Sequence, residues 1–542
     1  MVGNATALLP QIMNRLAQKY IHSGFTFIIK QPLNRNRISA CAVEVMAGIK
    51  SLAKDTAIYG LSSIVGRFLN WCLVPLYTQM FPPDEYGVVT YVYSAVALAL
   101  IILTYGMETG FFRFANHDRY KDPLEVYSTA LVSLGVSSVL FIVAMLAFIG
   151  PVSEALHAGS HHDYVVMMVV AVALDAFTAL PFSYLRYAKR PMRFASLRLV
   201  NIAVNIGLNL FFILICPWLW EYAPGWIAWF YDPDFGIGYI FLANLVSSVL
   251  NVALLLPELR GFRWRFNPAL WREMLAYSAP LLVLGVAGIM NQTLGTLLMP
   301  ELYADKGEGI TAVGIYGANY KIAIVMVMFI QAFRFAYEPF IFAKAKAQGE
   351  DRLQSYRDAM RWFVIFGMVI FLGVMYYLDI LRHFIAATYF SGLKVVPILM
   401  IAELFFGVFF NLSVWYKITD RTVWGMWLSL LGLVMTVGLN VLLVPRYGYI
   451  GCAWAAFGCY GAMMAASYIA GRMHYPIGYN VPRLAFYFVS GLVFWVVGEV
   501  IGIDAHPWLT MAMRTPLLAL YVFMVLRVEG VKLRGIRGFI GR

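Results

Sequence analysis

Two arginines lie deep within apolar stretches of the sequence, where a charged side chain is costly. Arg67 is near the middle of the stretch at 57–80, and Arg334 lies within 320–342. Placing an arginine at the centre of a membrane helix costs about 2.5–3.5 kcal/mol, so such a residue usually has a partner or a function. Guanidinium binds phosphate through two parallel hydrogen bonds and keeps its proton, so both residues are candidates for binding a phosphorylated anion.

Other polar side chains share helix faces with these arginines. Asn70 lies one helical turn after Arg67, and Gln331 lies one turn before Arg334. The apolar stretch at 276–300 carries an adjacent asparagine and glutamine. Because positions three, four or seven apart lie on one side of a helix, we expect one shared polar cavity. Its predicted substrate-binding residues are Arg67, Asn70, Asn291, Gln292, Gln331 and Arg334.

Carboxylates within the apolar stretches predict a different chemistry. Asp175 is the deepest, Glu403 occupies the equivalent stretch later in the chain, and Glu338 lies one turn after Arg334. A membrane carboxylate can take up a proton or Na⁺ and couple a conformational change to an ion gradient. We therefore expect ion coupling or gating at Asp175, Glu338 and Glu403. The alternative is ion pairing, between helices for Asp175 and Glu403 and within one helix for Glu338 and Arg334.

The remaining ionisable residues of the apolar stretches are interpreted as structural. Lys321 and Arg514 lie near the ends of their stretches, where a long side chain reaches the membrane surface, and Glu499 is taken as structural as well. The five cysteines are scattered without metal or redox spacing and are interpreted as small hydrophobic residues.

The amino-acid composition shows that the chain needs a lipid bilayer around it. Of 542 residues, 61% are hydrophobic and only 13% are charged, whereas soluble domains carry about 25% charged residues. This balance excludes a soluble enzyme, a disordered protein and a disulfide scaffold. The net charge of +12 is explained by lysines and arginines held on the cytoplasmic side of a membrane, and no nucleic-acid partner is expected.

Fourteen segments are apolar and long enough to cross a bilayer as helices. The sequence therefore predicts an all-α polytopic membrane protein whose membrane-spanning segments are 57–80, 88–108, 127–150, 165–187, 199–219, 237–257, 276–300, 320–342, 362–382, 395–416, 423–444, 449–471, 484–503 and 507–527.

The distribution of basic residues predicts the orientation of these spans. With a cytoplasmic N-terminus, 33 of the 41 lysines and arginines fall on the cytoplasmic side and only four on the opposite side. Because basic residues remain in the cytoplasm, we expect a multi-pass membrane protein with both termini cytoplasmic. Residues 1–45 resemble neither a signal peptide nor a packed domain. We expect either a mis-assigned extension before a true start at Met46 or a disordered cytoplasmic tail.

The two halves of the chain repeat each other. The motif LVPLY at 73–77 matches LMPELY at 298–303, and VNIGLN at 204–209 matches MTVGLN at 435–440, an offset of about 230 residues that covers six spans. An even number of spans makes the repeats parallel, an arrangement found in secondary transporters. The predicted domains are an extension at 1–45, six-helix lobes at 46–258 and 259–475, and two further helices with a basic tail at 476–542.

Longer motifs carry a resemblance to a known family. These are SLAKDTAIYGLSSIVGRFLN at 51–70, LVPLYTQMFPPDEYGVVTYVYS at 73–94, YGMETGFFRF at 105–114 and QAFRFAYEPFIFAKAK at 331–346. With them the chain resembles bacterial polysaccharide (O-antigen type) flippases of the multidrug/oligosaccharidyl-lipid/polysaccharide (MOP) exporter superfamily. The resemblance implies a MATE-like fold of two parallel six-helix bundles plus two C-terminal helices.

The same resemblance implies a function. Members of the family move polyprenyl-pyrophosphate-linked oligosaccharides from the cytoplasmic to the periplasmic leaflet for cell-surface polysaccharide and lipopolysaccharide biosynthesis. The expected partners are that lipid-linked oligosaccharide, membrane lipid, and the polymerase and glycosyltransferases of the same pathway. No cofactor is expected apart from a coupling proton or Na⁺.

Three other functions stay open at this point. A multidrug or cation antiporter would need an acidic cavity, which the central arginines oppose, whereas a flippase for the peptidoglycan lipid precursor is chemically close. A membrane glycosyltransferase or polymerase would use Asp232 and Asp234, which resemble a metal-binding D-x-D motif, but their loop is too short for a catalytic domain. No ATP-binding G-x-x-x-x-G-K-[ST] motif occurs. We therefore expect a transporter and no enzyme.

Overall fold

The computed structural model describes most of the chain beyond residue 67. The described residues are 60, 65–66, 68–117, 120, 122–159, 161–259, 266–345, 350–419, 421, 423–501 and 507–530, and within these the side chains of 336, 338–345, 350–351 and 507–508 are left out. The expectations for 1–45, Met46 and Arg67 lie outside the described residues.

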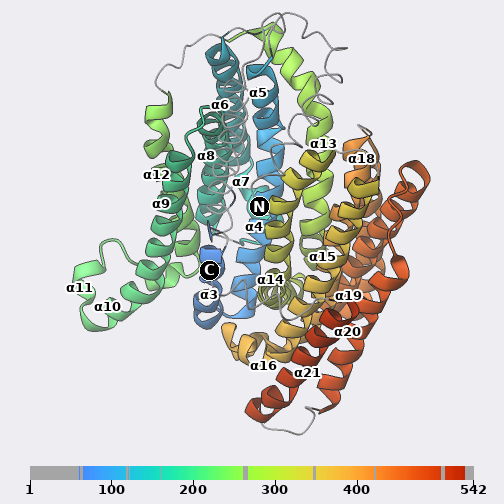
Figure 1. Cartoon of the computed structure of the whole chain (residues 1–542). Coiled ribbons are helices and arrows are strands. Elements are labelled where there is room, and N and C mark those ends of the chain that lie inside the picture. The colour runs from blue at the N-terminus through green and yellow to red at the C-terminus, as the bar shows by residue number, and fades with distance from the viewer. Residues whose placement is uncertain are drawn as a thin grey trace, which may run out of the picture. The chain divides into compact units, whose positions relative to one another are not determined.

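The described residues form helices and no strands (Figure 1). The first part of the chain contains α3 (Val74–Met80), α4 (Pro83–Thr104), α5 (Met107–Ala115), α6 (Pro123–Ala147), α7 (Ile149–Ala155), α8 (His162–Tyr187), α9 (Pro191–Leu210), the π-helix η1 (Phe211–Ile215), α10 (Cys216–Tyr222), α11 (Pro224–Ile227), η2 (Pro233–Phe235), α12 (Gly238–Leu255) and η3 (Leu256–Leu259).

The second part continues with longer helices. They are α13 (Pro268–Leu302), α14 (Lys306–Ala345), α15 (Glu350–Tyr376), α16 (Leu378–Leu381), η4 (Arg382–Phe384), η5 (Ala387–Lys394), α17 (Val395–Leu412), α18 (Val414–Ile418), α19 (Val423–His474), α20 (Val481–Ile501) and α21 (Pro507–Val528).

Within the described residues, twelve helical stretches are long and apolar enough to cross a membrane. The longest, α19, contains Gly448 at φ 56° and ψ −141°, a conformation that interrupts the helix and that glycine adopts readily. Two predicted spans, 423–444 and 449–471, therefore occupy this one element. Every predicted span from 88 onward overlaps at least one described helix, while the first is described only in part. The prediction of an all-α polytopic membrane protein is confirmed, with fourteen as an approximate number of spans.

Helix α13 begins at a capping residue, and both α13 and α14 extend further than hydropathy predicts. Asn267 accepts hydrogen bonds from the backbone of Ala269 and Leu270, each at 3.1 Å, and Pro268 opens α13. Helix α13 has 35 residues and α14 has 40, so each is roughly 50–60 Å long at the α-helical rise. Since the hydrocarbon core is about 30 Å thick, both helices continue beyond the bilayer.

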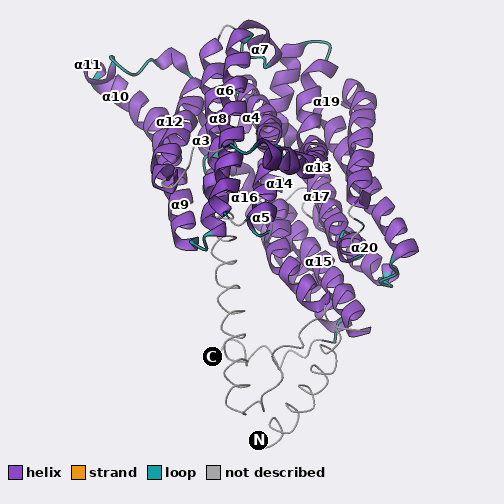
Figure 2. Ribbon diagram, turned by 90° about the horizontal axis from the view of Figure 1, so that it is seen from above, coloured by secondary structure: helices purple, strands orange, loops and turns teal. Residues whose placement is uncertain are grey.

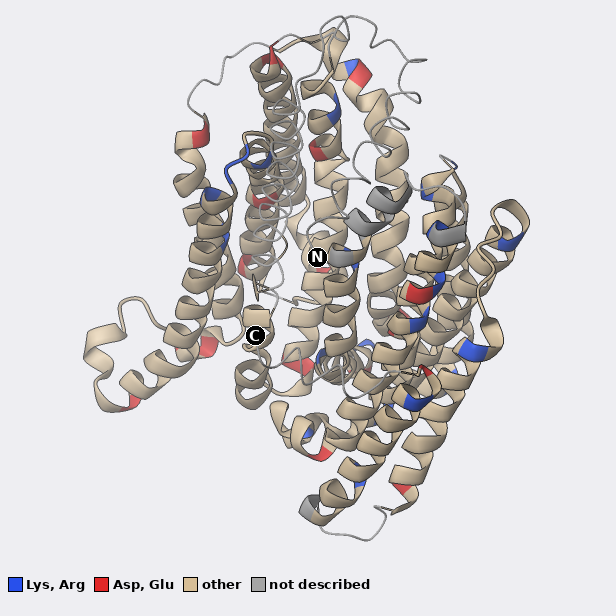
Figure 3. Cartoon of the chain, in the orientation of Figure 1, with Lys and Arg blue, Asp and Glu red and all other residues tan. Residues whose placement is uncertain are grey.

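Burial separates helices of the interior from helices of the lipid-facing surface. Helix α17 is mostly buried, whereas few residues of α9 and α20 are buried. The exposed positions are apolar, as at Val139 of α6 and Val434 of α19. Side chains of this type on the outside of a helix bundle require lipid as solvent. Figure 3 agrees, because long parts of the helices are free of charged side chains.

Helix α4 forms the centre of the bundle, since it packs against both α13 and α14 (Figure 2). The α4–α14 crossing is held close by glycines. A Cβ atom on Gly314 would lie 1.9 Å from the carbonyl oxygen of Pro83, and one on Gly87 would lie 2.1 Å from that of Ile310. Only glycine permits this approach. The division into lobes at 46–258 and 259–475, with a separate 476–542 region, stays a prediction.

Candidate functional site

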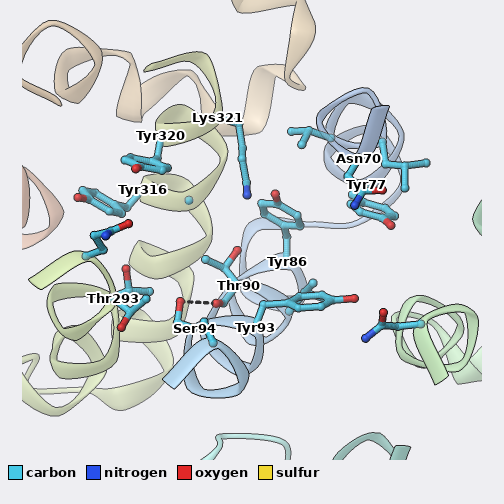
Figure 4. A pocket seen from close by; sticks show the side chains of 18 of the residues that line it. Asn70, Tyr77, Tyr86, Thr90, Tyr93, Ser94, Thr293, Tyr316, Tyr320 and Lys321 are labelled. Atoms are coloured by element: carbon cyan, nitrogen blue, oxygen red, sulfur yellow. Dashed lines mark hydrogen bonds between the residues drawn. The ribbon is translucent and has the colours of Figure 1, made fainter. Parts of the chain in front are cut away.

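A polar cavity of about 450 Å³ lies between α3, α4, α9, α12, α13 and α14 (Figure 4). Its volume falls within the usual range for small-molecule sites, which is about 300–1,000 Å³. The lining consists largely of amide and hydroxyl side chains, notably Asn70, Tyr77, Tyr86, Asn205, Gln292 and Tyr320. The cavity therefore offers many hydrogen-bond donors and acceptors within a membrane helix bundle.

Lys321 is the only charged side chain among the described residues that line this cavity. It extends from α14 towards the tyrosines of α4 (Figure 4). Among the described residues, none forms a hydrogen bond or ion pair with its ammonium group. Lys321 is half-buried, and an ammonium group that is partly removed from water and has no counterion favours binding of an anion.

The sequence interpretation of Lys321 as a residue at the membrane surface is corrected by the length of α14. Hydropathy started the span at 320, which placed Lys321 at its edge, but the helix begins at Lys306. Lys321 is consequently an interior residue of the helix and reaches the cavity. Its neighbour Tyr320, which the sequence analysis did not include among site residues, lines the same cavity.

The six predicted substrate-binding residues occupy different places. Asn70 and Gln292 line the cavity. Asn291 points elsewhere, because its amide nitrogen donates to the backbone oxygen of Ser429 at 3.1 Å. Gln331 and Arg334 are half-buried on α14 and are not among the residues that line the cavity. Arg67 lies outside the described residues, so its role stays a prediction.

Arg334 contacts an aromatic ring further along α14. Its guanidinium carbon lies 3.6 Å from the centroid of the Phe410 ring, and the Lys417 ammonium nitrogen lies 4.4 Å from the same centroid. Cation–π contacts of this kind contribute roughly 0.5–2 kcal/mol. The expected pairing of Arg334 with Glu338 is outside the described part, because the side chain of Glu338 is not described.

The two deepest carboxylates have different surroundings. Asp175 accepts a hydrogen bond from Ser248 at 2.9 Å, and the positive charge of Arg198 acts on it. Glu403 is 5% exposed and accepts a hydrogen bond from the Tyr320 hydroxyl at 2.9 Å. Through Tyr320, Glu403 is one hydrogen bond away from the cavity that contains Lys321.

A second, much smaller cavity of about 20 Å³ adjoins Glu403. Asn291 and Asn440 line it, and the side-chain oxygen of each is buried without a hydrogen-bond partner. Buried acceptors without donors are rare in folded proteins. Together with the Glu403 carboxylate they form an oxygen-rich site, the ligand type that small hard cations and protons require. Gln292 and Tyr320 line both cavities.

Two groups considered in the sequence have structural roles in the described part of the chain. The Arg514 guanidinium contacts Glu499 at 3.2 Å and Asp379 at 3.9 Å, so Arg514 and Glu499 form an ion-pair network. Asp232 accepts a hydrogen bond from the backbone of Asp234 at 3.0 Å and thereby caps η2. Within the described residues no group of three histidines, cysteines or carboxylates could hold a metal ion.

Next to the cavity residue Tyr86, contacts join distant parts of the chain. The Tyr389 hydroxyl of η5 donates to the backbone oxygen of Phe81 at 2.7 Å, and its ring meets that of Tyr86 edge-on at 5.9 Å. These contacts lie beside the glycine-mediated crossing of α4 and α14. The start of α4, η5 and the first part of α14 are therefore tightly packed beside the cavity.

The fold has relatives among solved structures. The lipid II flippase MurJ in an inward closed conformation gives a TM-score of 0.66 at 11% sequence identity, covering 87% of this chain and 99% of that chain. An inward-facing multidrug resistance MATE family transporter of the MOP superfamily gives 0.60 at 14% identity, covering 78% and 97%. An outward-facing transporter of that family gives 0.54 at 13% identity, covering 78% and 95%. No curated protein sequence matches the chain.

The helices and these neighbours define a multi-pass membrane protein whose fold is similar to that of the lipid II flippase MurJ and of MATE family transporters. A family model described as polysaccharide biosynthesis protein matches residues 52–343, more than half of the chain. The chain belongs to this polysaccharide biosynthesis protein family. The resemblance carried by the motifs at 51–70, 73–94 and 105–114 is therefore confirmed.

Proposed function

We propose that this protein is a flippase that moves a polyprenyl-pyrophosphate-linked oligosaccharide from the cytoplasmic to the periplasmic leaflet of the bacterial inner membrane. Its product serves cell-surface polysaccharide biosynthesis, with lipopolysaccharide O-antigen as the proposed pathway, and both termini are cytoplasmic. The observation that carries the proposal is the cavity charge. Lys321 is the only charged group among the described lining residues, so the cavity is cationic.

A cationic, hydroxyl-rich cavity suits a pyrophosphate with its first sugars. The ammonium group of Lys321 can contact phosphate oxygens, while the surrounding amides and hydroxyls can exchange hydrogen bonds with sugar hydroxyls. The polyprenyl tail needs no site in this cavity, since it can remain in lipid. Arg67, one turn before the cavity residue Asn70 in the sequence, is proposed as a second cation for the same headgroup.

The charge of the cavity and the capping role of Asp232 each argue against one of the alternatives. A cation antiporter needs carboxylates in contact with its cargo, and no carboxylate lines the cavity in the described part of the chain. An enzyme that uses a D-x-D motif needs two carboxylates free to hold a metal, whereas Asp232 caps a turn. A transporter without enzymatic activity, which acts beside the polymerase and glycosyltransferases of its pathway, fits these observations better.

We further propose that a proton or Na⁺ drives transport through Glu403. Glu403 is buried, accepts a hydrogen bond only from Tyr320 among the described residues, and adjoins the unpaired oxygens of Asn291 and Asn440. An ionised carboxylate in this environment is costly unless a cation or proton neutralises it. Asp175 is the second candidate, with Arg198 as a nearby charge, and Glu338 stays a sequence-based candidate for gating.

A flippase for the peptidoglycan lipid precursor is the second candidate function. It is favoured by the fold similarity to the lipid II flippase MurJ, and its cargo shares the pyrophosphate that Lys321 would bind. The two candidates differ only in the glycan, which the lining amides of the cavity do not distinguish.

Reconstitution into proteoliposomes tests both candidates. A fluorescent polyprenyl-pyrophosphate oligosaccharide or fluorescent lipid II is placed in one leaflet, and its exposure to an impermeant quencher is followed with and without an imposed pH or Na⁺ gradient. Gradient-dependent movement of the oligosaccharide lipid supports the proposed function. Movement of lipid II alone assigns the second candidate, and export of an organic cation without lipid movement contradicts both.

A further inference from the structure

A tryptophan-rich segment projects from the helix bundle. It consists of residues 216–231, which contain α10 and α11, and is called here the aromatic arm. The arm follows α9 after the π-helix η1, which together with Pro217 redirects the chain. Figures 1 and 2 both show α10 and α11 lying away from the other helices.

The inner side of the aromatic arm is packed. Cys216, Ile227 and Tyr231 are buried together with Tyr239 of α12. The Tyr231 and Tyr239 rings stack with centroids 5.1 Å apart, and the Tyr239 hydroxyl donates to the backbone oxygen of Asp232 at 3.1 Å. The arm is therefore a folded element with a fixed outer side.

The outer side of the arm consists of large aromatic side chains. Trp218 is 59% exposed, Tyr222 68%, Trp226 79% and Trp229 83%. Between residues 211 and 231 the sequence carries one charged residue, Glu221, and Figure 3 shows the region almost without charge. The surface of a soluble protein rarely exposes so much apolar area in one place. The outer side of the arm must therefore be covered by lipid or by another protein.

The position of the arm indicates that the lipid of the membrane surface covers it. Exposed apolar residues recur from Leu210 of α9 through Leu214 and Ile215 to Trp218, so the lipid-facing side of the bundle leads into the arm. At the base of the arm the Tyr164 hydroxyl, near the start of α8, donates to the backbone oxygen of Phe235 at 2.8 Å. The arm therefore leaves the bundle at the level where α8 begins.

Charged side chains mark the same level as the aqueous boundary. A cavity of about 570 Å³ is lined by Asp84 at the start of α4, Glu154 before α8, Asp234 at the base of the arm and Lys306 at the start of α14. Such a charged set lies in water and not in hydrocarbon. The aromatic arm thus combines an apolar outer side with a position at the edge of the hydrocarbon core.

We infer that the aromatic arm is an interfacial anchor, whose outer side lies in the headgroup layer of the leaflet nearest the starts of α4, α8 and α14. Tryptophan and tyrosine prefer this layer, because the ring is apolar while its polar group stays hydrated. The occupant is phospholipid, since the exposed surface is continuous with the lipid-facing side of α9. The anchor would hold the connection between α9 and α12 at a constant depth in the membrane. This role does not depend on which cargo the protein transports.

Depth-dependent fluorescence quenching tests this inference. Trp226 and Trp229, both mostly exposed, are replaced one at a time by cysteine in a chain whose accessible native cysteines are serine, and each site carries an environment-sensitive fluorophore in phosphatidylcholine–phosphatidylglycerol liposomes. Ser391→Cys is the aqueous control, because Ser391 is exposed in η5. Val139→Cys on the lipid-facing side of α6 is the deep control, since Val139 is 59% exposed.

Interfacial anchors lie about 5–10 Å into the headgroup boundary, so a nitroxide near the top of the acyl chain should quench the arm labels roughly threefold more than one near its end. The Val139 label should show the reverse preference, and aqueous iodide should quench the Ser391 label most strongly. Arm labels that iodide quenches as strongly as the Ser391 label would place the arm in water and overturn the inference. Labels shielded from both iodide and nitroxide lipids would also overturn it and assign the arm to a protein interface.

Discussion

The hydroxyl of Tyr320 donates a hydrogen bond to Glu403 at 2.9 Å. Tyr320 also lines the cavity that contains Lys321. This hydrogen bond connects the buried carboxylate of Glu403 with the cationic cavity. Tyr320 belongs to α14 and Glu403 to α17, and both helices lie in the interior of the bundle. A change in the charge of Glu403 alters the strength of the bond, because a carboxylate accepts more strongly than a carboxylic acid. The proposed ion coupling can therefore reach the cargo site through one side chain.

Lys321→Gln tests the anion site. The substitution keeps a polar side chain that can donate hydrogen bonds, although it is slightly shorter, and it removes the charge. Hydrogen bonds to charged groups contribute about 1.5–3 kcal/mol, so affinity for a pyrophosphate headgroup should fall roughly 10- to 100-fold. Binding of the fluorescent lipid-linked oligosaccharide by the purified protein provides the measurement, and Lys321→Arg should retain most of the affinity.

The matched control for this variant is Lys394→Gln. Lys394 is exposed at the end of η5 and does not line the cavity. Its removal changes net charge equally but should leave affinity within the error of the measurement. Equal loss in both variants would show that the protein's overall charge, and not Lys321, attracts the headgroup.

Tyr320→Phe tests the link between Glu403 and the cavity. Removal of the hydroxyl leaves the buried Glu403 without its donor, which costs about 1–3 kcal/mol of stability. The variant should unfold at a lower temperature in detergent, and its transport should respond less to an ion gradient. The control is Tyr316→Phe, since Tyr316 lines the same cavity one turn earlier. A Tyr320→Phe protein with full gradient response would remove Tyr320 from the coupling mechanism.

Glu403→Gln and Asp175→Asn distinguish the two candidate coupling sites. Each variant keeps the shape and hydrogen-bonding capacity of its side chain but cannot release a proton or hold a cation. If Glu403 is the coupling group, transport by Glu403→Gln should no longer depend on the gradient. Asp175→Asn removes the negative charge beside Arg198, so it should also lower the thermal stability. A variant that transports with an unchanged gradient dependence excludes its carboxylate from coupling.

Gly314→Ala tests whether the α4–α14 crossing must stay closed in the resting protein. The new methyl group would lie 1.9 Å from the Pro83 carbonyl oxygen, a distance that forces the helices apart. A cysteine placed at Thr90 in the cavity lining should then react faster with an impermeant thiol reagent added from the side where α4 begins.

Gly438→Ala is the control for the crossing. Gly438 also lies within a helix, but a Cβ atom there would have no neighbour within 4 Å. Alanine should therefore be neutral or stabilise the helix by up to about 1 kcal/mol. Unchanged thiol reactivity in Gly314→Ala would show that the crossing yields without opening the cavity.

The sequence alone determined the class of protein and the positions of nearly all spans. Long apolar stretches dictate helices in lipid, because every backbone polar group must be paired within its own segment. The family resemblance followed from contiguous motifs such as the one at 73–94. Two cavity residues, Asn70 and Gln292, were also predicted, since their spacing on helix faces is a local property.

Only the tertiary structure decided which polar residues meet. Lys321 lies in the interior of α14 and reaches the cavity, because the helix starts well before the hydrophobic stretch that the sequence predicts. Hydropathy cannot locate a helix start that lies among water-exposed residues. Arg334 shares a helix with Lys321, yet it packs on Phe410 and lies away from the cavity lining. The pairing of Tyr320 with Glu403 joins residues 83 positions apart. Such contacts depend on how helices cross, which single-helix periodicity does not encode.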